Sequence, residues 1–253
     1  MRKSSKPHYG YYAMSFFLLF STIIVIVGIV TALWLWWSIG IFIIAVGIAL
    51  ILNYGVSMYL LDQSKSLEPP PMLGLKGDEM VLDVGCGLGK MTMGVAKQLK
   101  TGKVIGIDIW SKTEIPGNSA ERATENARIE GVADRTEFRT GNVLAIPFDD
   151  ESFDVVTSVS VINNLHNDAE KLRALKEIYR VLRSEGKFLL LEPLRNLRGV
   201  FVFTPLFIWM TSPKEKWIKL LENAGFENLE FGYYSMMGAF LAKKPKSNYI
   251  ANP

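Results

Sequence analysis

A glycine-rich turn between a predicted strand and a predicted helix offers the most specific chemistry in this chain. Residues 81–89 read VLDVGCGLG, which ends an apolar, β-branched run and leads into a helical one. Glycines at alternate positions allow positive φ angles and let a ligand touch the backbone, with helix amides directed toward it. Several ligands suit such a turn, so the spacing of the glycines has to decide between them.

The spacing argues against two common phosphate-binding patterns. A P-loop needs GxxxxGK followed by Ser or Thr, whereas Lys90 is followed here by Met91. A dinucleotide fingerprint reads GxGxxG, but the third glycine of this turn, Gly89, comes one residue early. The pattern that remains is GxGxG.

An acidic residue at the end of the next predicted strand is a natural partner for this turn. Asp108 lies near the end of the run VIGIDIW at 104–110, and a carboxylate there can accept hydrogen bonds from two ribose hydroxyl groups. Asp83, within the turn, would suit an ammonium group of the ligand. Trp110 could pack either on an adenine face or in the interior of the domain, and both interpretations stay open.

Polar residues after the fourth predicted strand are candidates for the acceptor side of a reaction. In doubly wound folds the site lies beyond the carboxyl ends of the strands, which directs attention to Asn163 and His166. A histidine can act as a base near neutral pH. The alternative for His166 is a structural role in the turn before Asn167. Glu192, which ends the fifth predicted strand, is a weaker candidate.

Alternating strand-like and helix-like runs surround these residues. Strands are predicted at 80–85, 104–110, 136–140, 153–161 and 187–193. A helix over 213–223 and two successive strands at 226–234 and 236–244 follow, and the last two suggest an antiparallel pair. We therefore expect an α/β fold: a doubly wound, mostly parallel seven-stranded sheet with helices on both faces.

The helices between these strands carry start signals. A helical run follows the glycine turn as far as Lys100. Asn118 with Glu121, and Asn167 with Glu170, have the spacing of a capping box. These pairs predict helices that begin at Asn118 and at Asn167.

The turn, Asp108 and the order of elements resemble the class I S-adenosylmethionine-dependent methyltransferases. Residues 83–89 match the family's first motif, Asp-x-Gly-x-Gly-x-Gly, and Asp108 matches the acidic residue that holds the ribose. Residues 141–143 occupy the position of the loop that meets the adenine. The resemblance covers about 80–244 and is closest to the branch that methylates quinones, lipids and other small molecules.

Two departures from the family pattern accompany this resemblance. The adenine loop has Asn142 where the family usually has Asp, although an amide oxygen can still accept a hydrogen bond from an amino group. The turn at 182–187 lacks the usual Pro-Gly-Gly. The resemblance implies S-adenosylmethionine as cofactor, bound by Asp83, Gly85, Cys86, Gly87, Gly89, Asp108, Ile109, Trp110, Asn142, Val143 and Ser158.

The apolar residues are concentrated at the amino-terminal end. Residues 7–61 form a run of 55 without Asp, Glu, Lys or Arg, in a chain of 253 residues. Segments at about 13–37 and 39–61 each exceed the roughly 20 residues that span a bilayer as a helix. Ser38 and Gly40 lie where the two would meet. We therefore expect a tight hairpin of two transmembrane helices.

The hairpin divides the chain into three parts. Residues 1–63 are the expected membrane anchor, 64–79 a proline-containing linker and 80–246 the catalytic domain. By the positive-inside tendency, basic residues before and after the anchor place both of its ends, and the domain, in the cytoplasm. These residues are Arg2, Lys3, Lys6 and Lys65.

The distribution of charge excludes one class of partner. The net charge of +3 lies entirely in residues 1–61, and the remainder carries 25 basic and 25 acidic residues. Binding to nucleic acid needs a surplus of cations, so we expect no nucleic-acid partner. The single cysteine, Cys86, excludes an internal disulfide, and with only two histidines we expect no metal site.

A second apolar run, at about 199–211, is too short to span a bilayer. Arg195 and Arg198 precede it, and several lysines follow it. An apolar segment bordered by cations suits the surface of an anionic membrane, so we expect it to cover an apolar or lipid-like substrate. A buried core helix is the alternative.

Together these features predict an integral-membrane, S-adenosylmethionine-dependent methyltransferase that acts on a hydrophobic small molecule or lipid. Its expected partners are that substrate and membrane lipids, and pairs of small residues in the helices permit a homodimer. Two alternatives stay open. One is a non-catalytic, S-adenosylmethionine-binding assembly module, and the other is a nicotinamide-dependent oxidoreductase.

Overall fold

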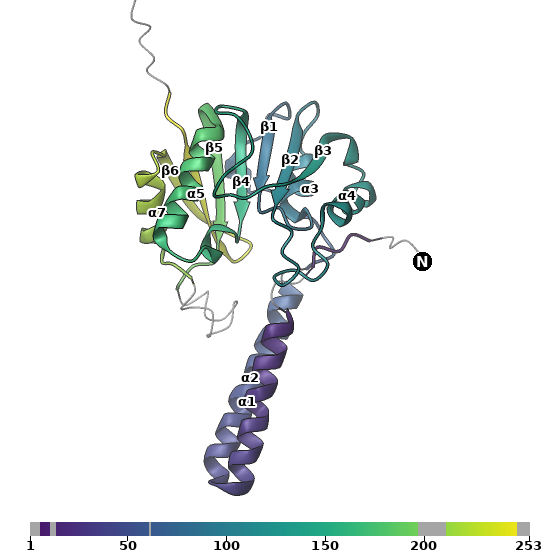
Figure 1. Cartoon of the computed structure of the whole chain (residues 1–253), viewed down its shortest axis with the longest axis vertical. Helices are drawn as coiled ribbons and strands as arrows, with labels where there is room; N and C mark the ends of the chain where they lie inside the picture. The colour runs from purple at the N-terminus through teal and green to yellow at the C-terminus, as the bar shows by residue number, and fades with distance from the viewer. Residues whose placement is uncertain (1–5, 11–13, 61, 197–210, 247–253) are drawn as a thin grey trace, which may run out of the picture.

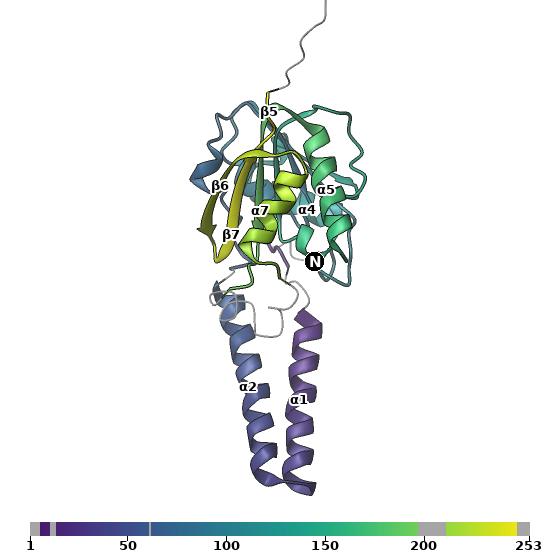
Figure 2. The same cartoon turned by 90° about the vertical axis from the view of Figure 1, so that its left-hand side faces the viewer.

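The computed structural model describes residues 6–10, 14–60, 62–196 and 211–246. It consists of a hairpin of two long helices and an α/β domain. The hairpin projects from one edge of the domain as a narrow stalk, with its two helices side by side (Figures 1 and 2). The parallel strands of the sheet point toward the hairpin, so their carboxyl ends lie on the hairpin side (Figure 1).

The stalk consists of α1 (Met14–Trp34) and α2 (Trp37–Leu60). Both helices contain a segment long and apolar enough to cross a membrane, and most of the surface of each segment is exposed. Aromatic side chains surround the far turn, where Trp34, Trp36 and Trp37 are all exposed. This distribution is typical of a membrane interface.

The turn of the hairpin lies at residues 35 and 36, before the predicted position at Ser38. The Trp36 N–H donates to the Thr31 carbonyl at 2.8 Å, and α2 already begins at Trp37. The prediction that Ser38 and Gly40 form the turn was therefore wrong. Gly40 instead serves helix packing, because a Cβ at this position would lie 2.4 Å from the Cα of Ala32.

The domain is built on a seven-stranded sheet of order β3-β2-β1-β4-β5-β7-β6. The strands are β1 (Met80–Val84), β2 (Lys103–Asp108), β3 (Thr136–Thr140), β4 (Phe153–Val159), β5 (Leu182–Glu192), β6 (Glu227–Tyr234) and β7 (Met237–Lys243). β1 to β5 run parallel, and β7 lies antiparallel between β5 and β6. This confirms the predicted sheet. An all-parallel dinucleotide-binding sheet has the order 3-2-1-4-5-6 without such an inserted strand.

Helices cover both faces of this sheet (Figure 1). α3 (Lys90–Ala96) and α4 (Ala120–Ile129) lie on one face, and α5 (Asp168–Val181) and α7 (Lys214–Asn223) on the other. Single 3-10 turns occur at Pro71–Leu73, Ala133–Arg135 and Ile162–Asn164. Two apolar clusters result, one on each side of the sheet, which is why the central strands are apolar at nearly every position.

The starts of two helices test the predicted caps. The side chain of Asn167 accepts a hydrogen bond from the Glu170 N–H at 2.9 Å, which confirms the predicted cap of α5. The predicted cap of α4 was wrong. Ser119 fills that role by accepting from the Arg122 N–H, because the side chain of Asn118 is bonded to Asp108.

Two other predicted boundaries also shift. α3 ends at Ala96 rather than at Lys100. β5 begins at Leu182, before the predicted residue 187, because Leu182 still pairs with Phe153 of β4 across a register shift. Residues 182–187, which lack the Pro-Gly-Gly of the family pattern, therefore belong to β5 and contain an irregularity in its pairing with β4.

The segment that precedes the hairpin, residues 6–10, is bound to the domain and is named here the leading strap. Tyr9 is buried, and its hydroxyl donates to Glu130, the residue that follows α4, at 2.8 Å. Burial, and then the hydrogen bond to Glu130, hold the pKa of Tyr9 well above its usual range, so the hydroxyl stays a donor. His8 exchanges two backbone hydrogen bonds with the side-chain amide of Asn126.

The segment that follows the hairpin, residues 62–68, is bound as well and is named the trailing strap. The ammonium group of Lys90, at the start of α3, donates to the Asp62 carbonyl at 2.8 Å. The Leu67 N–H donates to the Lys90 carbonyl at 2.9 Å. The Tyr9 N–H also donates to the Gln63 carbonyl at 3.1 Å, so the two straps are bonded to each other. The segments on both sides of the hairpin are thus bound to the domain, the leading strap at α4 and the trailing strap at α3.

Candidate functional site

The glycine turn after β1 has the left-handed backbone that its composition predicts. The φ angles of Gly85, Gly87 and Gly89 are +67°, +52° and +85°. The Gly85 N–H donates to the Ile107 carbonyl of β2 at 2.8 Å, which ties the turn to the neighbouring strand. A Cβ on Gly85 would lie 2.3 Å from the nearest methyl carbon of Val161. Glycine is therefore required at position 85 for both conformation and space.

Asp83 lies underneath this turn. Its carboxylate accepts hydrogen bonds from the hydroxyl groups of Thr92 on α3, at 2.5 Å, and Thr157 on β4, at 2.8 Å. Burial raises the pKa of Asp83 to about 6, because the two hydroxyl donors only partly offset the loss of solvation. Asp83 thus joins β1, α3 and β4. Its predicted contact with an ammonium group stays a prediction.

Asp108 lies at the carboxyl end of β2, directly beside the glycine turn. Its carboxylate accepts from the Gly87 N–H at 2.8 Å, the Trp110 N–H at 2.6 Å and the side-chain amide of Asn118 at 3.1 Å. Two carboxylate oxygens have about four accepting positions, so these donors orient the group without exhausting it. The structure therefore brings the acidic residue and the turn together as predicted.

Asn118 is a site residue that the sequence analysis missed. Its side chain is 2% exposed, and its amide oxygen is buried without a hydrogen-bond partner in the part of the chain that the structure describes. Buried acceptors are nearly always satisfied, so a ligand hydroxyl or amino group is the expected donor. The i,i+3 spacing to Glu121 favoured a cap, and no signal in the sequence pointed to Asp108 instead.

The two residues after Asp108 lie at the same edge of the sheet. Ile109 is 59% exposed. Trp110 is half-buried, has a φ of +58°, and donates from its indole nitrogen to the hydroxyl of Thr140 at 3.0 Å. A positive φ is uncommon for an aromatic residue and is often associated with a functional site. The indole is held at the surface and is not buried in the core.

The other predicted cofactor residues fall into two environments. Asn142 is exposed, and its amide oxygen already accepts from the Leu144 N–H at 2.9 Å, while Val143 is buried. Ser158 on β4 pairs with Val84 at the end of β1. Its hydroxyl is buried without a partner among the described residues, which marks a second polar atom that a ligand could satisfy.

The two catalytic candidates after β4 differ in position. Asn163 lies in the turn Ile162–Asn164, and its N–H donates to a carboxylate oxygen of Glu192 at 3.2 Å. The side chain of His166 is 89% exposed, with its Nδ1 3.4 Å from a carboxylate oxygen of Glu170. His166 is therefore far more open to solvent than Asn163, and its catalytic role stays a prediction.

Glu192 is the most strongly perturbed carboxyl group of this edge. It is fully buried at the end of β5, and one of its oxygens has no partner among the described residues. Burial raises its pKa to about 8, although the Asn163 N–H and the charge of Lys171 on α5 act in the opposite direction. At neutral pH this group is mostly the neutral acid and can donate a hydrogen bond.

The surroundings of Cys86 suggest no chemical role for its thiol. The thiol is buried, and burial raises its pKa well above the usual range. A thiol of this kind is a poor nucleophile and a poor metal ligand. Among the described residues, no group of three or more His, Cys, Asp or Glu side chains is placed to hold a metal ion.

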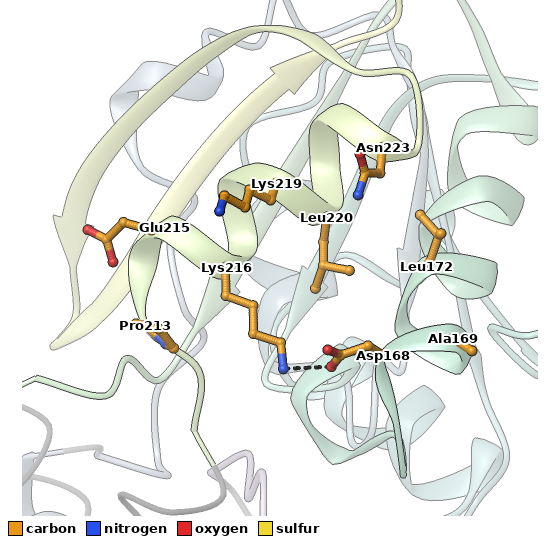
Figure 3. A pocket seen from close by; sticks show the side chains of 9 residues that line it. All are labelled: Asp168, Ala169, Leu172, Pro213, Glu215, Lys216, Lys219, Leu220 and Asn223. Atoms are coloured by element: carbon orange, nitrogen blue, oxygen red, sulfur yellow. Dashed lines mark ion pairs between the residues drawn. The ribbon is translucent and has the colours of Figure 1, made fainter.

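An open groove lies between α5 and α7, away from the glycine turn (Figure 3). Its lining includes Leu172, Leu220 and the ion pair of Lys216 with Asp168, whose charged atoms are 2.6 Å apart. None of the predicted cofactor or catalytic residues lines it. The predicted substrate-covering run at about 199–211 lies outside the described residues except for Thr211.

The arrangement fits an adenosyl ligand. The glycine turn lies directly beside the carboxylate of Asp108, which can accept hydroxyl groups, and Asn118 and Ser158 each present a buried polar oxygen without a partner among the described residues. A doubly wound sheet with an inserted antiparallel strand and this turn defines a methyltransferase-type, adenosyl-binding domain.

Comparison with known proteins agrees with this class. Residues 82–190 match the family model of a methyltransferase domain. The chain is 37% identical to a demethylmenaquinone methyltransferase of Lactiplantibacillus plantarum over 47% of this chain and 46% of that protein. It is 28% identical to a ubiquinone/menaquinone biosynthesis C-methyltransferase of Escherichia fergusonii, over 67% of this chain and 74% of that protein.

A solved structure shows the same fold. An S-adenosylmethionine-dependent methyltransferase of Methanosarcina mazei superimposes with a TM-score of 0.58 at 22% identity, over 71% of this chain and all of that one. The matched part of the chain spans about half the length of the Lactiplantibacillus relative. Residues 82–190 are similar to a methyltransferase domain, the sheet has the fold of S-adenosylmethionine-dependent methyltransferases, and these likenesses support S-adenosylmethionine as the cofactor.

Proposed function

We propose that this chain is a membrane-anchored methyltransferase that methylates a ring carbon of a hydrophobic, quinone-type molecule. The observation that carries the proposal is the combination, in one chain, of the glycine turn beside Asp108 with a hairpin apolar enough to span a bilayer. The names of the two relatives support this substrate class, since both refer to quinone methylation. An anchored enzyme meets a bilayer-dissolved substrate without first extracting it.

The cofactor, when bound, supplies a methyl group that is already activated on a sulfonium. The chain has to hold the cofactor, align the acceptor and exclude water. Asp108 and Asn118 would hold the ribose end, and the glycine turn would lie against the rest of the cofactor.

An acceptor carbon must also lose a proton after the new bond forms. Glu192 is mostly protonated at neutral pH, which makes it a hydrogen-bond donor rather than a base. We therefore propose that His166 accepts this proton. Its side chain is exposed and lies beside Glu170.

Transfer of a labelled methyl group tests the proposal. The full chain in liposomes that contain demethylmenaquinone should label the quinone when supplied with methyl-labelled S-adenosylmethionine. Asp108→Asn should reduce labelling at limiting cofactor, whereas Asp78→Asn, at an exposed position before β1, should not. Cofactor binding without transfer to the quinone or to any extracted lipid would instead favour the non-catalytic module.

A further inference from the structure

The exposed large apolar side chains of the domain gather at one edge. From residue 62 onward, the described residues include three such side chains, namely Ile109 at 59%, Tyr233 at 51% and Met236 at 46% exposure. Ile109 directly follows the last residue of β2. Tyr233 and Met236 lie around the turn from β6 to β7, beside the carboxyl end of β5, because Glu192 pairs with Gly238. All three therefore lie at the carboxyl-end edge of the sheet.

The turn between β6 and β7 holds its apolar tip at a conformational cost. Ser235 and Met236 have φ angles of +46° and +69°. A two-residue hairpin turn with two positive φ values is normally built from Asn-Gly or Gly-Gly. Strained residues of this kind often mark functional positions, and here the strain places a methionine at the tip of the turn.

The same edge is the one from which the hairpin leaves. In both views the stalk extends from the side to which the strands point, and the β6–β7 turn lies on that side (Figures 1 and 2). The leading and trailing straps bind α3 and α4 through Lys90, Asn126 and Glu130. A hairpin fixed at both ends leaves the domain little freedom to turn this edge away.

We infer that this edge, marked by Ile109, Tyr233 and Met236, is a membrane-contacting surface. It lies against the bilayer that α1 and α2 span, so the inference rests on the proposed membrane anchoring. The buried apolar area gained by three such side chains is small, but the hairpin already removes the entropy of bringing the two surfaces together. The cofactor turn lies at the same edge, so a bilayer-dissolved acceptor reaches the site from the side.

Site-directed fluorescence tests the contact directly. Tyr233→Cys and Met236→Cys, in the full chain, would be labelled with an environment-sensitive dye; the native Cys86 is buried and serves as the unlabelled background. Thr101→Cys, exposed at the opposite edge just before β2, is the matched control. In vesicles of phosphatidylcholine and phosphatidylglycerol that carry a bromine on the acyl chain, positions 233 and 236 should be quenched at least twofold more than position 101. Equal quenching at all three positions overturns the inference.

Replacing the two residues of this turn gives a second test, in which the variant is expected to stay folded. The double change Ser235→Asn and Met236→Gly supplies the residues that the turn geometry favours, so the variant should unfold at the same or a higher denaturant concentration. We expect its rate on a bilayer-dissolved quinone to fall severalfold, with an unchanged rate on a short-chain, water-soluble quinone. Unchanged rates on both substrates contradict the inference.

The two proposals fail in different ways. If positions 233 and 236 are quenched but no quinone is methylated, the proposed function is wrong and the membrane-contacting edge stands. If quinone is methylated without quenching at these positions, the function stands and the edge is not in contact. If the chain does not float with the vesicles in a density gradient, the membrane anchoring itself is wrong.

Discussion

Replacing Glu192 by glutamine should remove a pH dependence of folding that this one carboxyl group creates. The group is fully buried, and burial raises its pKa from 4.5 to about 8. Between these values the folded protein keeps a proton that the unfolded chain has released. The free energy of unfolding therefore falls as the pH rises through this interval. The stabilisation that the protonated Glu192 contributes is fully present below pH 4.5 and is lost as the pH rises to about 8.

The magnitude follows from the size of the shift. One pKa unit corresponds to about 1.4 kcal/mol, so Glu192 should cost the wild-type protein about 4 kcal/mol between pH 5 and pH 8. Glutamine has a similar shape and does not titrate. Glu192→Gln should therefore gain stability relative to wild type as the pH rises, by about this amount. Asp83, whose pKa is also raised, is present in both proteins and cancels from the difference.

Chemical denaturation of the full chain in detergent micelles, followed by tryptophan fluorescence, measures this difference. Trp217 in the core, close to Lys171, should report the transition. Glu222→Gln, on an exposed part of α7, is the matched control and should follow the wild-type profile. Parallel pH profiles for wild type and Glu192→Gln would refute the argument, because they would mean that Glu192 is already ionised in the folded protein.

Three further substitutions test the site and its attachment. Asp108→Asn should weaken binding of S-adenosylmethionine by about 10- to 100-fold in calorimetry, since hydrogen bonds to a charged group contribute about 1.5–3 kcal/mol; an unchanged affinity would remove Asp108 from the site. Gly85→Ala should lower the unfolding free energy by more than about 2 kcal/mol, because its Cβ would clash with Val161, and a neutral effect in urea denaturation would contradict the turn geometry. Tyr9→Phe should cost about 1 kcal/mol and loosen the leading strap, seen as faster hydrogen exchange in α4; unchanged exchange would show that the strap does not stabilise this helix.

Much of the fold could be predicted because the controlling signals are local. The apolar run at 80–84, the glycine spacing that follows it and the capping pair at Asn167 each act within a few residues. The antiparallel β6–β7 pair was predicted for the same reason, since two strand patterns in direct succession most simply form a hairpin. The contact of Asp108 with the turn followed from the rule that parallel strands present their carboxyl ends at one edge.

What could not be predicted depends on contacts between distant residues. The pairing of Asn118 with Asp108 overrides a cap that the local sequence favours. The hairpin turns before the predicted residues because Gly40 packs against Ala32 within the helix pair. Helix packing, and not turn propensity, determines the position of this turn. The raised pKa of Glu192 depends on its complete burial at the end of β5, which no pattern around Glu192 reveals. The straps are tertiary contacts as well: residues 6–10 were expected to belong to the membrane anchor, and residues 64–68 to the linker.

The leading strap has a consequence for how the protein is made. Tyr9 bonds to Glu130, which is synthesised 121 residues later, after the whole of the apolar hairpin between them. At synthesis rates of about 5–20 residues per second, the first residues of the chain wait roughly 6–25 s for their binding site to exist. During that interval nothing on the finished domain restrains the amino terminus. In the membrane-anchored arrangement proposed above, the orientation of the hairpin must therefore be set before the leading strap binds the domain, and this binding then stabilises an orientation that is already established.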